Sequence, residues 1–173
     1  GAQCANPNVN VLVDYTGTFI DPDLGAEIAQ GMINQGVQVI FGVAGATGNG
    51  SILYGTQHNI WGIGVDADEY ISTFAEGTVD GSDKLLTSAM KYLDFAVKQT
   101  ISDHLNGSFS SGTVTYDLAD AGVGLAPYHE TDASIPPLTK EYVEAIKAGI
   151  IDGTINIDEP CREVSPDYYP SFS

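Results

Sequence analysis

Three carboxylates stand close together after one of the apolar runs of this sequence. Asp66, Asp68 and Glu69 fall within four residues, directly behind the run Ile60–Val65. A cluster of this kind can hold a hard cation, but the calcium-loop pattern D-x-[DN]-x-[DN]-G followed by a distant Glu is absent. A carboxylate at the end of a strand also suits the vicinal hydroxyls of a ribose. The third interpretation is a solvated acidic turn, and the residues alone leave all three open.

A glycine-rich loop follows another apolar run. Gly42–Gly50 (GVAGATGNG) precedes a helix that we expect to begin at Ser51, where free backbone N–H groups favour an anion or a hydroxyl oxygen. The loop is not a P-loop, because no Gly-Lys-Ser/Thr follows, and it lacks the third glycine of the dinucleotide fingerprint. It is therefore either a ligand cradle or a plain tight turn. Phe41, just before it, is either a stacking platform for a planar ligand or a core residue.

Lys91 is notable because cations are scarce in this chain. It falls at the start of a predicted helix, where the helix dipole disfavours a positive charge. Lys91 therefore either serves a site or forms an ordinary surface pair with Asp94. Candidates for catalysis are lacking, since no G-x-S-x-G motif occurs and the three histidines show no metal-ligand spacing. We expect no catalytic residue, no metal site, no cofactor and no enzymatic activity.

The charge balance narrows the range of partners. Six Lys and Arg residues stand against 23 Asp and Glu residues, which gives a formal net charge of −17. Six dispersed cations cannot neutralise a phosphate backbone, so nucleic-acid binding is excluded, as are anionic membrane surfaces. No apolar run approaches the roughly 20 residues of a membrane helix. The 173 residues suit one domain or one large lobe, and a hydrophobic content of 43% is enough for a core.

The two cysteines lie near opposite ends of the sequence, at positions 4 and 161. Their separation disfavours a zinc or thioredoxin-like site. They are either joined in a disulfide or two unrelated thiols. A bridge between Cys4 and Cys161 would stabilise the fold by about 4 to 5 kcal/mol in the chain-entropy model and would indicate an oxidising compartment.

The first half of the chain alternates strands and helices. Asp21-Pro22 is a typical helix start, and Gly36 a typical stop. Short connections between the elements predict a parallel sheet covered by helices on both faces, in the α/β class. In such sheets ligands bind beyond the carboxyl ends of the strands, which here carry Asp14, the loop after Phe41, and Asp66. The predicted strands are Val9–Tyr15, Val37–Phe41 and Ile60–Val65.

The second half keeps the alternation less regularly. A helix to about Asn106 should present Met90, Leu93, Val97 and Ile101 on one face, and another should cover Leu138–Ala148 and stop at Gly149. Residues 159–173 are polar and interrupted by proline, which predicts an irregular tail. The predicted strands of this half are Leu85–Thr87 and Thr113–Leu118.

Several motifs resemble those of a known family. Four of them, preceded by Thr16–Pro22 (TGTFIDP), occur in the family's order: Val39–Gly50 (VIFGVAGATGNG), Ile63–Asp68 (IGVDAD), Thr87–Lys91 (TSAMK) and Gly122–Pro127 (GVGLAP). With them the sequence resembles the basic membrane protein family over about Val9 to Ile157. These proteins are substrate-binding lipoproteins of ABC transporters, and many of them bind purine nucleosides.

The resemblance implies a type I periplasmic-binding-protein fold, in which two Rossmann-like lobes joined by a hinge clamp a ligand between them. Residues 1–158 match the C-terminal lobe, residues 159–173 form the tail, and the half that builds most of the first lobe is missing. The segment 87–106 would cross to that first lobe. We therefore expect its helix to repack, to swap into a second copy, or to meet the N-terminal lobe as a partner chain.

The resemblance also assigns roles to single residues. Phe41 matches the aromatic that stacks on the nucleobase, and Gly45 matches backbone near the ribose. Asp66 matches the carboxylate that accepts hydrogen bonds from the ribose hydroxyls, and Lys91 matches the cation that donates to the ribose. A purine nucleoside, or a similar small solute, and a transporter permease are the implied partners. The implied location is extracytoplasmic, with a lipid anchor in the full-length protein.

Two functions of other classes fit the same fold. One is a hydrolase that uses Asp66 and Asp68 with a divalent metal. The other is a receptor-type domain that senses a ligand, because a fold does not fix a function. Turnover or metal dependence would favour the hydrolase. The lack of a nucleophile, base or metal motif in the sequence weighs against it.

Overall fold

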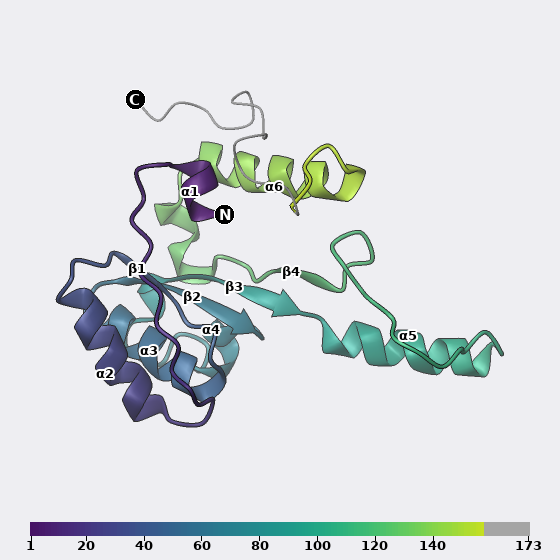
Figure 1. Ribbon diagram of the computed structural model, residues 1–173, viewed down its shortest axis with the longest axis horizontal. Helices are drawn as coiled ribbons and strands as arrows, with labels where there is room; N and C mark the ends of the chain where they lie inside the picture. Colours follow the sequence, from purple (N-terminus) through teal and green to yellow (C-terminus); the bar gives the residue numbers. More distant parts are fainter. Residues whose placement is uncertain (158–173) are drawn as a thin grey trace. The chain divides into compact units, whose positions relative to one another are not determined.

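The computed structural model describes residues 1–157 and divides the chain into two compact units. The larger unit comprises residues 14–133 and contains the whole sheet (Figure 1). The smaller unit combines residues 1–13 with the chain from Ser134 onward. The predicted tail, residues 159–173, lies outside the described residues.

The sheet has four strands in the order β1-β2-β3-β4. The first three run parallel, with Ile40 opposite Gly62 and Gly64 opposite Ser88. The α/β class with a parallel sheet and flanking helices is thereby confirmed. β4 adds an antiparallel edge that the sequence did not predict, and it pairs Gly124 with Met90. The strands are β1 (Val39–Phe41), β2 (Trp61–Asp66), β3 (Leu85–Lys91) and β4 (Val123–Leu125).

β3 runs four residues further than the predicted strand Leu85–Thr87. Met90 pairs with both β2 and β4, so it is a strand residue and not the first apolar residue of the following helix. The prediction was wrong here because the hydrogen bonds to β4, a strand more than 30 residues later, are invisible in local periodicity. Lys91 therefore ends a strand and does not begin a helix.

Helix α2 (Pro22–Ile33) begins as the sequence predicts. Asp21 is its N-cap, and its side chain accepts a hydrogen bond from the backbone N–H of Leu24 at 3.0 Å. That bond satisfies one of the free N–H groups of the first turn, and Pro22 supplies a backbone angle already suited to a helix.

Helix α3 (Gly45–Gln57) packs directly on α2 through glycines. A Cβ atom on Gly25 would lie 1.8 Å from the carbonyl oxygen of Thr47, and one on Gly50 would lie 2.0 Å from that of Pro22. The glycine-rich segment is thus mostly helix, and the helix begins at Gly45 and not at the predicted Ser51. Close packing between the two backbones outweighs the poor helix propensity of glycine.

The core of the larger unit lies between α3, the sheet and the segment after β2. Ile52, Phe74 and Leu85 form a buried cluster, with Leu53, Tyr70 and Val79 packed against it. Gly62 lets α3 approach β2, because a Cβ atom there would lie 2.8 Å from the Ile52 side chain. Short helices α4 (Glu69–Ser72), η1 (Ser82–Lys84) and η2 (His129–Ser134) complete the unit.

Two predicted strands do not form. Val9–Tyr15 makes no ladder with β1 or any other described strand, and Val11, Val13 and Tyr15 are exposed. Thr113–Leu118 is likewise outside the sheet, with Val114 exposed. Both segments have the β-branched composition of strands, but that composition stabilises a strand only when a neighbouring strand and a core face are present.

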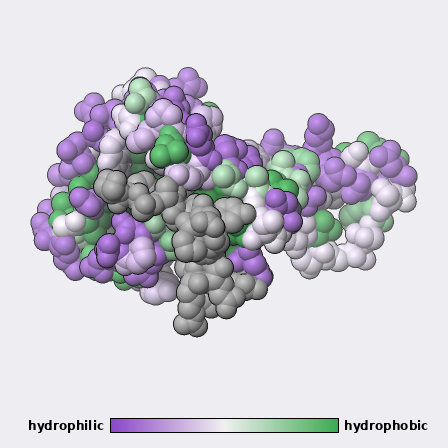
Figure 2. Space-filling model, turned by 90° about the horizontal axis from the view of Figure 1, so that it is seen from above, coloured by the Kyte–Doolittle hydropathy of each residue, from purple (hydrophilic) through white to green (hydrophobic). Residues whose placement is uncertain are grey.

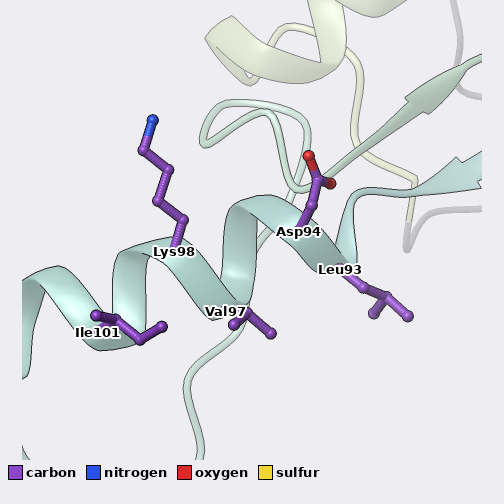
Figure 3. Close-up of a pocket in the computed structure, with 5 residues that line it drawn as sticks. All are labelled: Leu93, Asp94, Val97, Lys98 and Ile101. Atoms are coloured by element: carbon purple, nitrogen blue, oxygen red, sulfur yellow. The ribbon is translucent and has the colours of Figure 1, made fainter.

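Helix α5 (Leu93–Leu105) has no buried residue and extends away from the sheet within the larger unit (Figure 1). Leu93, Val97 and Ile101 lie along one side of it and are all exposed, and Asp94 and Lys98 lie beside them and line the same open pocket (Figure 3). Figure 2 shows hydrophobic residues between hydrophilic ones on this part of the surface, at the right. We call these three apolar residues, with Leu105, the α5 stripe.

The smaller unit contains α1 (Ala2–Ala5) and α6 (Pro137–Asp152). Helix α6 ends at Gly153, whose φ of 78° gives the left-handed conformation usual after a helix. The predicted stop, Gly149, is instead inside the helix, and Ile155 packs against it. Cys4 is disulfide-bonded, whereas Cys161 lies outside the described residues. In the described part of the chain, no helix has the length and apolar character to span a membrane.

Candidate functional site

The carboxyl ends of β2 and β3 bring two of the predicted site residues together. The Oδ1 atom of Asp66 lies 2.6 Å from the Nζ atom of Lys91. The strand register explains the pair, because Asp66 lies opposite Met90, the residue before Lys91. The surface pair between Lys91 and Asp94 that the sequence left open is therefore not formed. Both side chains are accessible, Lys91 to 61% and Asp66 to 53%, so the pair can exchange partners with a ligand.

Asp66 lies in a strained turn. Its φ is 69°, and the backbone N–H of Ala67 donates to the carbonyl oxygen of Val65 at 2.8 Å. This three-residue γ-turn is rare, and a residue with a Cβ atom adopts the left-handed region at a cost of about 1 to 3 kcal/mol. Strain of this kind concentrates at functional sites, so the backbone supports a role for the Asp66 carboxylate in binding.

Phe41 ends β1 at the same edge of the sheet. Its side chain is 53% exposed, whereas the preceding Ile40 is buried. The alternation of a strand explains the difference, because successive side chains point to opposite faces. Phe41 is thus not a core residue, and its ring is available for stacking. Gly42 continues from it and donates a backbone hydrogen bond to Ile63 of β2 at 3.2 Å.

Gly45 begins α3 with a φ of 54°. The carbonyl oxygen of Phe19 accepts a hydrogen bond from Ala46 at 2.9 Å, and a Cβ atom on Gly45 would lie 2.9 Å from that same oxygen. One backbone N–H of this helix terminus is therefore already paired. The segment that follows packs against α2, as the close approach of Gly50 to Pro22 shows, so this glycine has a structural role.

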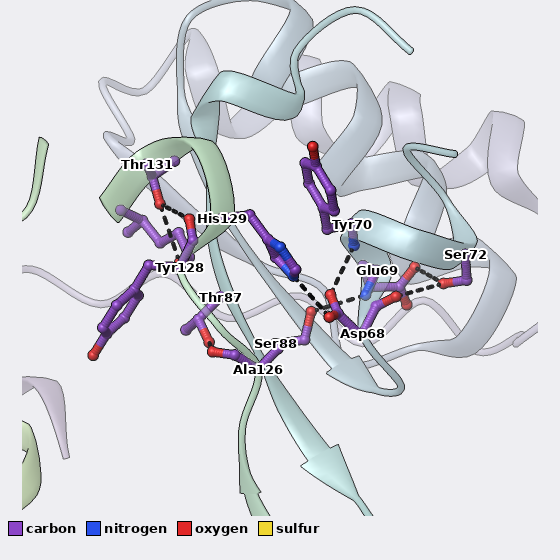
Figure 4. Close-up of polar contacts among 11 residues, drawn as sticks. Asp68, Glu69, Tyr70, Ser72, Thr87, Ser88, Ala126, Tyr128, His129 and Thr131 are labelled. Carbon is purple, nitrogen blue, oxygen red and sulfur yellow. Dashed lines mark hydrogen bonds and ion pairs between the residues drawn. The ribbon is translucent and has the colours of Figure 1, made fainter. Parts of the chain in front are cut away.

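The three clustered carboxylates, Asp66, Asp68 and Glu69, have different partners in the structure. Asp68 caps α4 and contacts His129, while Glu69 is buried and accepts a hydrogen bond from Ser72 (Figure 4). The Thr73 hydroxyl also donates to the Glu69 carboxylate. Of the three, only Asp66 has a side chain that is more than half exposed. Within residues 1–157 no group of three or more His, Cys, Asp or Glu side chains is arranged to hold a metal ion. Asp66 and Asp68, which the hydrolase hypothesis requires to share a metal, instead pair with Lys91 and His129.

The contact between His129 and Asp68 was not predicted from the sequence. The His129 Nε2 atom lies 2.8 Å from the Asp68 Oδ2 atom, although 61 residues separate them. No local spacing could reveal it. The sequence shows only that each of the two residues closely follows a motif: His129 follows Gly122–Pro127, and Asp68 follows Asp66 at the end of a predicted strand.

Comparison with known proteins places the chain in a family. The sequence model of the Bmp family, described as "ABC transporter substrate-binding protein PnrA-like", matches residues 1–159. The chain belongs to the Bmp family. The resemblance to basic membrane proteins is thereby confirmed, and this is a family of substrate-binding proteins and not of enzymes.

Curated Bmp relatives agree with this assignment. The chain is 37% identical to the CD4+ T-cell-stimulating antigen of Listeria monocytogenes, over 92% of this chain and 46% of that protein. It is 31% identical to the ABC transporter nucleoside-binding protein BmpA of Lactococcus lactis, over 91% of this chain and 46% of that one. The chain thus spans about half the length of the curated relatives it matches.

Solved structures show the same architecture. A solute-binding protein of an ABC transporter system from Aeropyrum pernix matches with a TM-score of 0.68 and 26% identity, over 90% of this chain and 49% of that one. A second solute-binding protein, from Conexibacter woesei, has a TM-score of 0.69 at 20% identity, over 98% of this chain and 51% of that one, which supports the fold alone. The Bmp chain therefore has the fold of about half of an ABC solute-binding protein.

Proposed function

We propose that this chain forms part of the substrate-binding component of an ABC transporter, and that it binds a purine nucleoside or a related small solute. The observation that carries the proposal is the accessible Asp66–Lys91 pair, which stands on a strained turn at the carboxyl edge of the sheet. A carboxylate and an ammonium group side by side offer both an acceptor and a donor to vicinal hydroxyls. The nucleoside-binding protein BmpA among the relatives supports this ligand class.

Each residue at the strand ends has a distinct role in the proposed complex. Asp66 accepts hydrogen bonds from the ribose hydroxyls, and Lys91 donates one to a ribose oxygen. Phe41 stacks on the base, because its ring is exposed at the end of β1. The backbone beside Gly45 contacts the ribose. The action is binding and release by closure of two lobes, without chemical turnover.

The exposed apolar residues of the α5 stripe support the proposal that this chain packs against a second lobe. Leu93, Val97 and Ile101 expose apolar side chains in a helix without a buried residue, and a contiguous apolar face of this kind normally meets a partner. The chain covers only about half of its relatives. We therefore assign residues 1–158 to the C-terminal lobe and residues 87–106 to the crossover that packs on the other lobe.

The other lobe also completes the ligand site. More than half of each side chain in the Asp66–Lys91 pair is exposed, whereas small-molecule sites bury most of the ligand. The full-length protein then acts outside the cytoplasm, anchored by lipid, and delivers the solute to a transporter permease.

Isothermal titration calorimetry on the complete protein tests this function. Adenosine, inosine and guanosine are titrated into the wild type and into the Asp66→Ala and Asp83→Ala variants. Asp83 is the matched control, because it also pairs with a lysine, Lys84 at 3.7 Å, but in η1, before the first residue of β3. We expect binding that Asp66→Ala abolishes and Asp83→Ala preserves. Absence of heat with every nucleoside in the wild type would refute the ligand class.

A further inference from the structure

The residues that follow Asp66 in the sequence form a second set of polar contacts, separate from the Asp66–Lys91 pair. Asp68 lies two positions after Asp66, and its side chain is only 12% exposed. Its Oδ1 atom accepts a hydrogen bond from the backbone N–H of Tyr70 at 3.1 Å, which caps α4. Its Oδ2 atom lies 2.8 Å from His129 Nε2. Both carboxylate oxygens of Asp68 are thus engaged, and they fix the chain directly after the strained turn.

His129 is itself held firmly. Its ring stacks on that of Tyr70, with the centroids 4.0 Å apart and the planes at 11°. In Figure 4 the imidazole lies between Tyr70 and Asp68, with a ring nitrogen directed at the carboxylate. The neighbouring Glu130 accepts hydrogen bonds from Tyr70 Oη at 3.4 Å and from Ser82 Oγ at 2.8 Å. Tyr70 and Asp68 thus contact the imidazole directly, while Tyr70 and Ser82 hold the adjacent residue, Glu130.

The segment before His129 is fastened to the strand that carries Lys91. The backbone N–H of Ala126 donates to Ser88 at 2.9 Å, and its carbonyl oxygen accepts from the Thr87 hydroxyl at 2.7 Å. Val123 of β4 lies opposite Lys91 itself. Asp66 and Lys91 are thus linked in two ways. One link is their ion pair, and the other runs through Asp68, His129 and the hydrogen bonds that join the segment before His129 to β3.

We infer that Asp68 and His129 are positioning residues, which hold the turn of Asp66 in the conformation that presents its carboxylate beside Lys91. The inference rests on the proposed function for its effect on a ligand. A left-handed residue that is not glycine persists only where its surroundings fix it. The Asp68–His129 contact supplies that restraint from outside the turn, so that the acceptor is in place before the ligand arrives.

The test uses the complete protein and two readouts. The first is hydrogen exchange at the Ala67 amide, whose bond to Val65 closes the turn, and the second is the affinity for the tightest-binding of adenosine, inosine and guanosine. His129→Ala should accelerate the exchange and weaken binding by about tenfold, because it leaves the mostly buried Asp68 carboxylate without its partner. His129→Gln keeps a side-chain N–H donor for Asp68 and should restore most of the affinity. In an Asp66→Asn background, His129→Ala should cost much less, because it acts through Asp66.

His58→Ala is the matched control. His58 also stacks on a tyrosine, Tyr54, with centroids 4.0 Å apart, but its Nδ1 atom contacts the backbone carbonyl of Tyr54 and no carboxylate. It should change neither readout. Unchanged exchange at Ala67 in His129→Ala would overturn the positioning pair even where nucleosides bind, and so would faster exchange with unchanged affinity. A wild type that binds no nucleoside refutes the proposed function instead, because the exchange readout needs no ligand.

Discussion

Replacing Gly25 by alanine should separate the two helices that form one side of the fold. The added Cβ atom would lie 1.8 Å from the Thr47 carbonyl oxygen, 2.9 Å from its carbon and 3.0 Å from the Ser51 nitrogen. All three are backbone atoms, so no side chain can rotate away. Ordinary van der Waals contact begins near 3.4 Å, and α2 must therefore move as a body away from α3.

Two opposing contributions determine how much Gly25→Ala changes the free energy of unfolding. Overpacking of a close interface costs about 3 kcal/mol at the upper end of its usual range, and here it acts between backbones. Alanine in place of glycine within a helix returns about 1 kcal/mol. The free energy of unfolding should therefore fall by about 2 kcal/mol. Gly31, in the same helix, is the matched control, since no atom lies within 4 Å of a Cβ atom there.

Urea denaturation of the complete protein measures both variants. Gly25→Ala should lower the unfolding midpoint, and Gly31→Ala should raise the free energy of unfolding by about 0.5 to 1 kcal/mol, because only the propensity term applies. If Gly25→Ala stabilised the protein as much as Gly31→Ala, the direct backbone contact between α2 and α3 would be refuted.

Three further predictions concern single side chains. Lys91→Met should weaken nucleoside binding in calorimetry yet change the free energy of unfolding by less than about 1 kcal/mol, because exposed ion pairs contribute little; a larger loss of stability would contradict this. Val97→Asp in the complete protein should cost about 2 to 3 kcal/mol in urea denaturation if the α5 stripe packs on the other lobe, and nothing if the stripe stays exposed. Desolvation and the Glu130 carboxylate raise the pKa of the Tyr70 phenol above its ordinary value of 10.0, so stability should fall as the pH rises through that pKa. Glu130→Gln should lower this pKa, as NMR titration of the tyrosine carbons would show, and an unchanged pKa would argue against the contact.

Local sequence signals predicted the elements that depend on local chemistry. The Asp21 cap, the β1 and β2 strands and the carboxylate at the end of β2 are confirmed, because caps, apolar runs and strand ends are properties of neighbouring residues. The family resemblance placed Asp66 and Lys91 in one site, and the register of β2 and β3 explains why the two side chains form an ion pair there.

Elements that depend on distant partners were not predictable. Val9–Tyr15 has a strand's composition but pairs with no strand of the described sheet. β3 extends beyond Thr87 because it pairs with β2 as far as Met90 and with β4 as far as Lys91. The start of α3 at Gly45 depends on the approach of α2, which glycine permits. The Asp68–His129 contact joins two loops through tertiary structure alone. In each case the deciding interaction lies outside any local window of sequence.

Recognition of the ribose hydroxyls by Asp66 can be measured with a nucleoside that lacks them. The affinities of inosine and 2′,3′-dideoxyinosine are determined by calorimetry for the complete wild-type protein and for Asp66→Asn. We expect the wild type to prefer inosine by at least about tenfold, the range for hydrogen bonds to a charged group, and Asp66→Asn to lose most of this preference. Equal preference in both proteins would show that other residues recognise the hydroxyls and would refute the proposed role of Asp66.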